Sequence, residues 1–540
     1  MTARDWPADL YLIGCEPSSG IASAAAHPAG AEPSPQSMGF KAYNLLRMAQ
    51  LGLRVPPAFV LGTRHCAAAG ATPQLDAAAW LPGLRALERS SGLRLGDARR
   101  PLLLSVRSGA PVSMPGMMET LLNIGLCDAT APGLLRQTGQ PRLVWDAYRR
   151  LVATHGEVVA GLPGEVFERE LRALAGSRDE RDLDFAELRA LTQRFLAAYQ
   201  REAGFAFPQD PREQLASAIA AVFASWHAPK ATQYREQHHI DAAIGTAVAV
   251  QAMVFGNAGG ASGAGVGFTR DPSTGERQLW VDFLFNAQGE DVVSGRRSAH
   301  GHEALAEVLP AAWAELQAAT AQLERAFGDM QDFEFTVQDA TLYLLQTRSG
   351  KRTPQAAARI ALDLLDEGLI DSEEARRRTD GLGAEQLATA RVVADDGQAL
   401  SPLAHAASAA TGVAIGEIAF DGERAAQRHA AGADVILVRR DAETSDSAAL
   451  QAARGLLTQR GARTSHAAVV ARQLGKVCLV GCEALAIDEA ARTARIGEQL
   501  LREGDVLTLD GHTGALYAGR ARTVTDVPQD LMRRLQALRG

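Results

Sequence analysis

Lysine is scarce in this sequence. Only 4 of its 55 basic residues are lysine, at Lys41, Lys230, Lys351 and Lys476, and the rest are arginine. A lysine therefore marks a place where a compact ammonium and a planar guanidinium are not interchangeable, such as a phosphate site. The 63 acidic residues outnumber the bases and give a net charge of −8. This balance argues against binding to nucleic acid or to an anionic membrane surface.

Long apolar runs are also missing. Charge or glycine interrupts each run well before the ~18 residues that a membrane-spanning helix needs. The N-terminal stretch MTARDWPADL has no apolar segment typical of a signal peptide. The five cysteines are scattered, and the close pair Cys478 and Cys482 has neither zinc-ribbon nor thioredoxin spacing. We therefore expect a cytoplasmic protein whose reduced thiols are packed in its interior.

The length of 540 residues predicts roughly three or four domains at about 150 residues each. Residues 16–37 are rich in proline, serine, alanine and glycine, which predicts a flexible surface insertion. Short helical and strand-like runs alternate over 40–125 and include a buried strand at 102–106. Residues 130–245 carry apolar side chains at helical spacing and are expected to be mostly helical.

From residue 246 onward the apolar period changes to two, which predicts an antiparallel hairpin with its turn at the D-P-S-T-G stretch. Helix is expected again at 301–327, followed by the strand pair DFEFTVQ and TLYLLQTR and by helices at 354–378 and 384–391. The polar stretch VVADDGQALSP then predicts a domain boundary. Beyond it, residues 411–520 alternate six short strands with short helices, which is typical of a compact α/β domain.

Two segments in the first part of the chain are suited to phosphate chemistry. The glycine-rich stretch GNAGGASGAGVG either brings backbone N–H groups close to phosphate oxygens or forms a flexible hairpin tip. It is neither a P-loop nor a Rossmann turn, because no G-K-[ST] follows and a strand comes next. Arg107, at the end of a predicted strand, can bind phosphate as a fork or form an ordinary surface ion pair.

Asp332 and Glu334 lie two positions apart on a predicted strand, so their carboxylates project from the same face. Such a pair either carries Mg²⁺ with nucleotide phosphates, because Mg²⁺ prefers hard oxygen ligands, or is simple charge on an exposed strand.

The stretch GARTSHAAVVARQLGK at 461–476 carries the strongest local signal. Thr464 and Ser465 are residue types that cap helix N-termini, and Gly475 closes the apolar run that follows. His466 is therefore expected in the first turn of a helix, where the free N–H groups and the helix dipole stabilise an anion. A neutral imidazole there can attack a phosphoryl group and carry it as phosphohistidine.

These segments together resemble the pyruvate phosphate dikinase family. The similar stretches are SVRSGAPVSMPGMMETLLNIGL, GTAVAVQAMVFGN with SGAGVGFTRDPSTGE and NAQGEDVVSG, DFEFTVQDATLYLLQTRSGKRT, and LTQRGARTSHAAVVARQLGKVCLVGC with a D-G-x-T-G motif. They occur in the family's order and cover residues from about 38 to 520. The resemblance implies a multidomain α/β and α+β protein: an ATP-grasp nucleotide-binding domain over 1–395 with a helical segment at 130–245, a swivelling phosphohistidine domain over 396–525, and a C-terminal tail over 526–540.

The resemblance also implies site residues. Lys41 and Arg107 would contact nucleotide phosphates and act in catalysis with His466, the phosphocarrier. The loop from Gly256 to Gly267, with Gly263 and Gly265, would close over the triphosphate. Mg²⁺ and the nucleotide would be bound by Asp332, Glu334 and Gln346, with Arg348 close by. Asp282 would also bind the nucleotide.

The chain departs from the family pattern at several of these positions. The family's G-G-K is Gly39-Phe40-Lys41 here, and its G-G-M-T-S-H becomes G-A-R-T-S-H, with Arg463 at the methionine position. Asp282 stands where the family has glutamate, and an A-S-P-G turn becomes Ala410-Thr411-Gly412. None of these changes removes a group to which we assign chemistry.

The resemblance implies an ATP-dependent phosphotransferase. ATP and inorganic phosphate would give AMP, diphosphate and phosphorylated His466, which would then phosphorylate pyruvate. Only about 20 residues follow the phosphohistidine domain, whereas a pyruvate-binding (β/α)₈ barrel needs ~200 or more. We therefore expect the acceptor on a separate barrel subunit, or another small molecule or protein. Two alternatives remain: a non-catalytic nucleotide-binding regulator, and an enzyme that runs the same chemistry backwards to make ATP.

Overall fold

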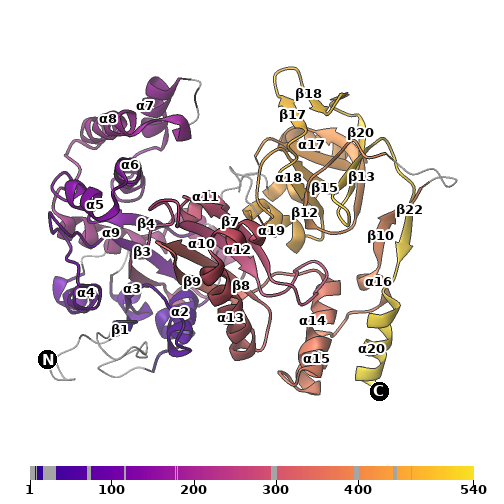
Figure 1. Ribbon diagram of the computed structural model, residues 1–540, viewed down its shortest axis with the longest axis horizontal. Coiled ribbons are helices and arrows are strands. Elements are labelled where there is room, and N and C mark those ends of the chain that lie inside the picture. The colour runs from indigo at the N-terminus through magenta and orange to yellow at the C-terminus, as the bar shows by residue number, and fades with distance from the viewer. Residues whose placement is uncertain are drawn as a thin grey trace. The chain divides into compact units, whose positions relative to one another are not determined.

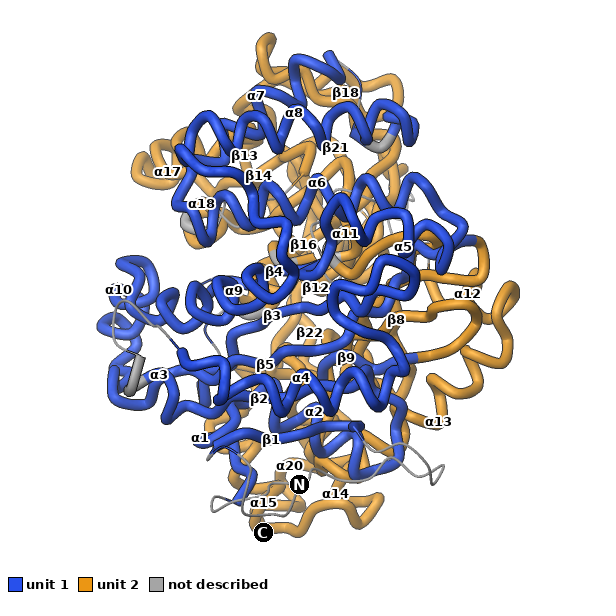
Figure 2. Tube along the Cα trace, turned by 90° about the vertical axis from the view of Figure 1, so that its left-hand side faces the viewer, with its two compact units in different colours: residues 1–259, 343–347 blue, residues 260–342, 348–540 orange. Residues whose placement is uncertain are grey.

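The computed structural model describes residues 7, 9–15, 32–69, 75–112, 114, 117–176, 178, 180–293, 301–394, 401–441, 447–463 and 465–540. Most of the insertion predicted at 16–37 lies outside these residues, as does Thr464. The chain divides into two compact units (Figure 2): unit 1 holds residues 1–259 and 343–347, and unit 2 holds residues 260–342 and 348–540. Among the described residues, no helix is long and apolar enough to cross a membrane.

Unit 1 is built on a five-stranded sheet with the order β1-β2-β5-β3-β4, and its paired strands are antiparallel. The strands are β1 (Leu10–Ile13), β2 (Ala58–Leu61), β3 (Leu104–Gly109), β4 (Thr120–Ile124) and β5 (Ala247–Ala252). The strand predicted at 102–106 therefore begins two residues later and runs further. β1 and β2 are buried at every position, in keeping with their apolar sequences.

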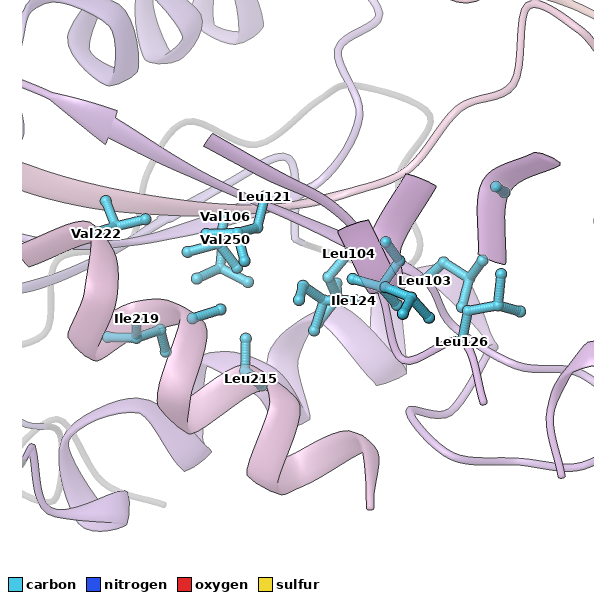
Figure 3. Close-up of a cluster of buried hydrophobic side chains, with 14 of the residues drawn as sticks. Leu103, Leu104, Val106, Leu121, Ile124, Leu126, Leu215, Ile219, Val222 and Val250 are labelled. Carbon is cyan, nitrogen blue, oxygen red and sulfur yellow. The ribbon is translucent and has the colours of Figure 1, made fainter. Parts of the chain in front are cut away.

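Helices make up most of the rest of unit 1 (Figure 1). They are α1 (Pro35–Met38), α2 (Phe40–Gln50), α3 (Thr63–Ala69), α4 (Ala77–Ser91), α5 (Ala131–Thr138), α6 (Pro141–Val158), α7 (Glu165–Ala175), α8 (Phe185–Ala203), α9 (Pro211–Ser225) and α10 (Pro229–Gln237). The prediction of a mostly helical region over 130–245 is confirmed. Figure 3 shows Leu215, Ile219 and Val222 of α9 facing Val106 and Val250 of the sheet, within the main apolar core of this unit.

Unit 2 begins with a four-stranded sheet of order β7-β6-β8-β9. The strands are β6 (Gly263–Phe268), β7 (Trp280–Phe285), β8 (Gln331–Gln338) and β9 (Thr341–Ser349), of which residues 343–347 belong to unit 1. β6 pairs antiparallel with β7 across the turn at 271–275, so the predicted hairpin is confirmed. The connecting helices are α11 (Gly289–Val293), α12 (His302–Val308) and α13 (Pro310–Phe327).

A second group of elements in unit 2 combines residues 354–392 with the C-terminal residues 523–539. The elements are α14 (Pro354–Asp366), α15 (Ser372–Arg378), α16 (Ala384–Leu387), β10 (Thr389–Val392), β22 (Thr523–Asp526) and α20 (Gln529–Arg539). The helix predicted at 384–391 is wrong in its second half, because β10 pairs there with β22. The segment expected as a C-terminal tail contains α20, whose Leu531 and Leu535 pack on Leu362 and Leu387.

The remainder of unit 2 is an α/β module with an eight-stranded sheet of order β11-β21-β20-β13-β14-β15-β16-β12. Its strands are β11 (Ala404–His405), β12 (Ala407–Ala410), β13 (Val413–Ala419), β14 (Val435–Arg439), β15 (Gly455–Thr458), β16 (Val477–Val480), β20 (Val506–Asp510) and β21 (Ala515–Ala518). All six strands predicted over 411–520 are present, and β13 to β16 pair in parallel.

Three helices and a small sheet complete this α/β module. The helices are α17 (Gly422–Ala430), α18 (Ser447–Ala452) and α19 (His466–Gln473). The sheet contains β17 (Leu485–Asp488), β18 (Thr493–Ile496) and β19 (Gln499–Arg502). These three strands are not predicted from the sequence. All five cysteines of the chain are free, and four of them are buried, as predicted.

Candidate functional site

The start of α2 lies against the end of β3 in unit 1. Gly39 has φ +75°, and a Cβ atom there would fall 1.8 Å from the carbonyl oxygen of Gly109, so only glycine fits. The backbone N–H of Phe40 donates to the carbonyl of Ala110 at 3.0 Å. Lys41, the second residue of α2, is thereby held close to the strand that carries Arg107. Contact of the two side chains with phosphate stays a prediction.

Gln346 belongs to the short piece of β9 that is part of unit 1. The side-chain amide of Asn44 on α2 donates to the carbonyl of Thr347 at 2.8 Å, and the N–H of Leu344 donates to the carbonyl of Arg54 at 2.9 Å. Gln346 is 7% exposed. Unit 1 therefore brings the helix of Lys41 and the strand of Gln346 together.

Asp332 and Glu334 lie on β8 in unit 2, on one face of the strand. Phe333 and Phe335, which alternate with them, are buried in the opposite direction. The guanidinium of Arg348 donates through Nε to Oδ2 of Asp332 at 2.7 Å. Burial raises the pKa of the Asp332 carboxyl, and Arg348 opposes this shift. Burial alone would lower the pKa of Arg348, but the two carboxylates outweigh it and raise that pKa.

The predicted metal ligands are thus divided between the units, with Gln346 in unit 1 and the two carboxylates in unit 2. Within the described part of the chain, no group of three or more His, Cys, Asp or Glu side chains is arranged to hold a metal ion. The donor chemistry of two carboxylates and an amide oxygen nevertheless suits Mg²⁺. The metal assignment stays a prediction.

The glycine-rich segment differs from the expected loop. Its second half forms β6, so the predicted loop from Gly256 to Gly267 ends before Gly263. The physical reason is packing against aromatic rings of the neighbouring strands. A Cβ atom at Gly263 would lie 2.1 Å from Phe283, and one at Gly265 would lie 2.4 Å from Phe335. The alternating glycines therefore make room for the aromatic rings of the sheet. Nucleotide contacts from Gly256, Gly263 and Gly265 stay predictions.

Helix α19 begins at His466, as the sequence predicts. Ser465 is its N-cap, and the Ser465 hydroxyl accepts a hydrogen bond from the backbone N–H of Ala468 at 3.4 Å. The helix connects β15 to β16, and its buried Ala467, Ala468 and Ala471 pack against the module's parallel strands. His466 is therefore held at the N-terminus of a helix anchored in a buried core.

Comparison with known proteins agrees with these features. Residues 84–308 and 301–368 match the family described as pyruvate phosphate dikinase, AMP/ATP-binding domain. The chain belongs to the pyruvate phosphate dikinase family. Residues 432–514, which include α19, match the family described as PEP-utilising enzyme, mobile domain.

Individual pyruvate phosphate dikinases are similar over most of the present chain. Pyruvate, phosphate dikinase 2 of Zea mays is 43% identical over 490 residues, covering 89% of this chain and 55% of the maize protein. The enzymes named pyruvate, phosphate dikinase from Rhizobium meliloti and Clostridium symbiosum are 42% and 41% identical, and each is covered to 56% of its length. The chain thus spans about half the length of the curated relatives it matches.

Asp282, a predicted nucleotide-binding residue, is buried and paired with a cation. It is 2% exposed on β7, and its Oδ1 accepts from Nε of Arg463 at 3.2 Å. Both residues depart from the pattern that the family resemblance implies, and they are in contact within unit 2. No local pattern in the sequence indicates this contact, or the places of Trp280 and Arg472 beside it. The signal that points to it is that both residues depart from the pattern implied by the resemblance.

Proposed function

We propose that this chain carries out the nucleotide-dependent half of a pyruvate phosphate dikinase reaction. ATP and inorganic phosphate would be converted to AMP and diphosphate, and His466 would become phosphorylated. The position of His466 at the first residue of α19, directly after its N-cap, carries the proposal. Backbone N–H groups in a first helical turn lack intrahelical acceptors, so they stabilise the charge that a phosphoryl group adds.

The neutral imidazole of His466 would act as the nucleophile in this reaction. A ring nitrogen forms a bond to the β-phosphorus of ATP, and AMP leaves with the oxygen that bridged the α- and β-phosphorus atoms. The γ-phosphoryl group is transferred to inorganic phosphate, which gives diphosphate, and the β-phosphoryl group stays on the imidazole. Such transfers depend on positioning and on neutralising charge rather than on elaborate covalent chemistry.

We propose an ATP-grasp fold for the nucleotide-binding part, in line with the family match over 84–368. Lys41 and Arg107 would neutralise phosphate oxygens. Asp332, Glu334 and Gln346 would hold Mg²⁺, which would supply further positive charge next to the phosphates. Arg348 would orient the carboxylate of Asp332, because it already donates a hydrogen bond to it.

The proposed acceptor is pyruvate, by analogy with the names of the relatives. We propose that a separate barrel subunit binds it. Another small molecule or protein is the alternative acceptor. No observation favours a non-catalytic regulator, since every residue assigned to chemistry is present. The cytoplasmic location expected from the sequence stays a prediction.

The test is to incubate the full chain with Mg²⁺, phosphate and ATP labelled at either the β or the γ position. We expect acid-labile, base-stable β-label on the protein, together with AMP release. His466→Ala should abolish the β-label on the protein. His429→Ala, which removes an exposed imidazole on α17, should retain the label. Label retained by His466→Ala, or none retained by the wild type, would refute the proposal. Transfer of γ-label with ADP release would indicate a simple kinase instead.

A further inference from the structure

Unit 2 contains a cavity of about 640 Å³, which is lined by residues of α13, of the segment between β6 and β7, and of the segment that follows α14. Pockets that bind small molecules measure about 300–1,000 Å³, so this cavity has room for a whole metabolite. None of the described residues that line it is among those assigned to the nucleotide, the metal ion or the phosphoryl group. The cavity is therefore a candidate for a separate ligand.

Helix α13 turns a polar face to the cavity. Gln317, Thr320 and Glu324 line it at intervals of three and four residues, so they lie on one face of the helix. Leu316 and Leu323, on another face of the same helix, are fully buried. The apolar face of α13 thus packs in the core of the unit, and its polar face is left for the cavity.

The two acidic residues among the described lining are already paired. Oε1 of Glu324 accepts from Nη2 of Arg270 at 2.7 Å, and its Oε2 accepts from the hydroxyl of Thr269 at 2.7 Å. Arg270 also donates to Oε1 of Glu367, the other acidic residue, at 2.9 Å. Because Arg270 is buried and carries a full charge, it offsets the negative charge of this wall.

Two arginines of the lining are exposed, Arg277 and Arg325. Nη1 of Arg277 lies 3.6 Å from Oε1 of Glu367, which is beyond hydrogen-bond distance. Within the described part of the chain, Arg325 has no ion-pair partner. A guanidinium group binds a carboxylate or a phosphate through paired N–H donors. The cavity therefore presents cationic groups that an anionic ligand can use.

Apolar side chains complete the lining. They are Leu279, Ala321 and Leu369, and the two leucines are half-buried. A small inorganic ion would leave this apolar surface in water, whereas a ligand with an apolar body would cover it. The lining is therefore suited to a molecule that carries both an anionic group and an apolar part.

We propose that this cavity binds a small organic anion. Its head group, a phosphate or a carboxylate, is held by Arg277 and Arg325. Its apolar body lies against Leu279, Ala321 and Leu369. The site is separate from the residues assigned to phosphoryl transfer, and the inference does not depend on the proposed function.

Isothermal titration calorimetry of the full chain tests the site with four probes. Phenyl phosphate and benzoate carry both an anionic group and a ring, whereas inorganic phosphate lacks the ring and phenol lacks the charge. We expect a dissociation constant on the order of 1 mM for the first two, as for other ligands of this size, and binding at least about tenfold weaker for the other two. The tighter of the first two identifies the head group. Saturating ATP should change the affinity for phenyl phosphate less than twofold, because the nucleotide binds elsewhere.

Substitutions locate the binding to this cavity. Arg277→Met and Arg325→Met should each weaken phenyl phosphate binding about tenfold or more, because each removes a charged hydrogen-bond donor. Ala321→Trp keeps both arginines but fills the cavity, and it should abolish binding. Arg533→Met removes an arginine on α20 that is 77% exposed and outside the lining, so it should match wild type. Circular dichroism of each variant checks that the fold is intact.

Several results would overturn the inference. One is an unchanged affinity for phenyl phosphate in both Arg277→Met and Arg325→Met. Another is binding of inorganic phosphate as tight as that of phenyl phosphate, which would mean that the apolar surface contributes nothing. Displacement of phenyl phosphate by ATP would place the probe in the nucleotide site. Absence of binding by both phenyl phosphate and benzoate up to about 10 mM would also refute the site.

Discussion

Arg270 has no exposed side-chain surface, although it carries a full charge. Its Nε and Nη2 donate to Oε1 of Glu324 at 3.0 and 2.7 Å, and Nη2 also donates to Glu367 at 2.9 Å. The hydroxyl of Thr269 satisfies the second oxygen of Glu324 at 2.7 Å. Burial would lower the pKa of Arg270, but these carboxylates outweigh it and raise the pKa. Each charge in this buried group therefore depends on the others.

Replacing Arg270 by methionine should destabilise unit 2 by about 3–5 kcal/mol, because Glu324 would be left buried without its cation. Urea denaturation followed by circular dichroism measures the change. Arg277→Met is the matched control: Arg277 is 66% exposed and lies 3.6 Å from Glu367, so it should cost less than about 1 kcal/mol. The double variant Arg270→Met/Glu324→Gln should recover part of the lost stability. Equal losses of stability in Arg270→Met and Arg277→Met would contradict this account.

Strand β6 shows how one sequence pattern can satisfy two structural requirements. Alternating glycines are typical of an open loop, and the same period of two also suits a strand whose small residues face large ones. The rings of Phe283, Phe333 and Phe335 occupy the space that side chains at Gly263, Gly265 and Gly267 would need. Sequence alone could not separate these interpretations, because the aromatic partners lie on other strands.

Gly265→Ala should therefore destabilise unit 2 by about 1–3 kcal/mol through overpacking. Its Cβ would lie 2.4 Å from Phe335 and 3.0 Å from the carbonyl oxygen of Asp282. Gly260→Ala, five residues earlier, is the control, since a Cβ there would meet nothing within 4 Å. Chemical denaturation should show recovery in Gly265→Ala/Phe335→Leu. A stability of Gly265→Ala equal to that of Gly260→Ala would mean that the rings do not set this requirement.

Across the whole molecule, the acidic composition says little about how stability changes with pH, because individual buried groups decide it. His155 on α6 is 1% exposed, with Nδ1 3.1 Å from the Tyr199 hydroxyl and Nε2 3.2 Å from the Ser217 hydroxyl. Burial lowers the pKa of His155 from 6.5 to about 4. The folded protein therefore holds this imidazole neutral at pH values where an unfolded chain would protonate it.

His155 makes the stability of the folded protein depend on pH. Between pH 6.5 and about 4 the unfolded chain binds a proton that the folded chain does not, so stability falls as the pH falls through this window. The full effect is on the order of 3 kcal/mol. Denaturation at pH 7.5 and pH 5 should show a smaller loss in His155→Gln than in wild type. His227→Gln, which changes an exposed histidine, should keep the wild-type loss, and an unchanged loss in His155→Gln would refute the assignment.

Local signals in the sequence determined much of this protein. Periodicity located the helical region, the hairpin and all six predicted strands of the α/β module, and the Ser465 cap placed His466 at the start of α19, because these features depend on residues close together in the chain. Tertiary structure decided the rest. The glycines of β6 and the contact between Arg463 and Asp282, 181 residues apart, depend on partners that no local pattern specifies. Burial, which sets the cost of each charge and each added methyl group, exists only once those distant segments have packed.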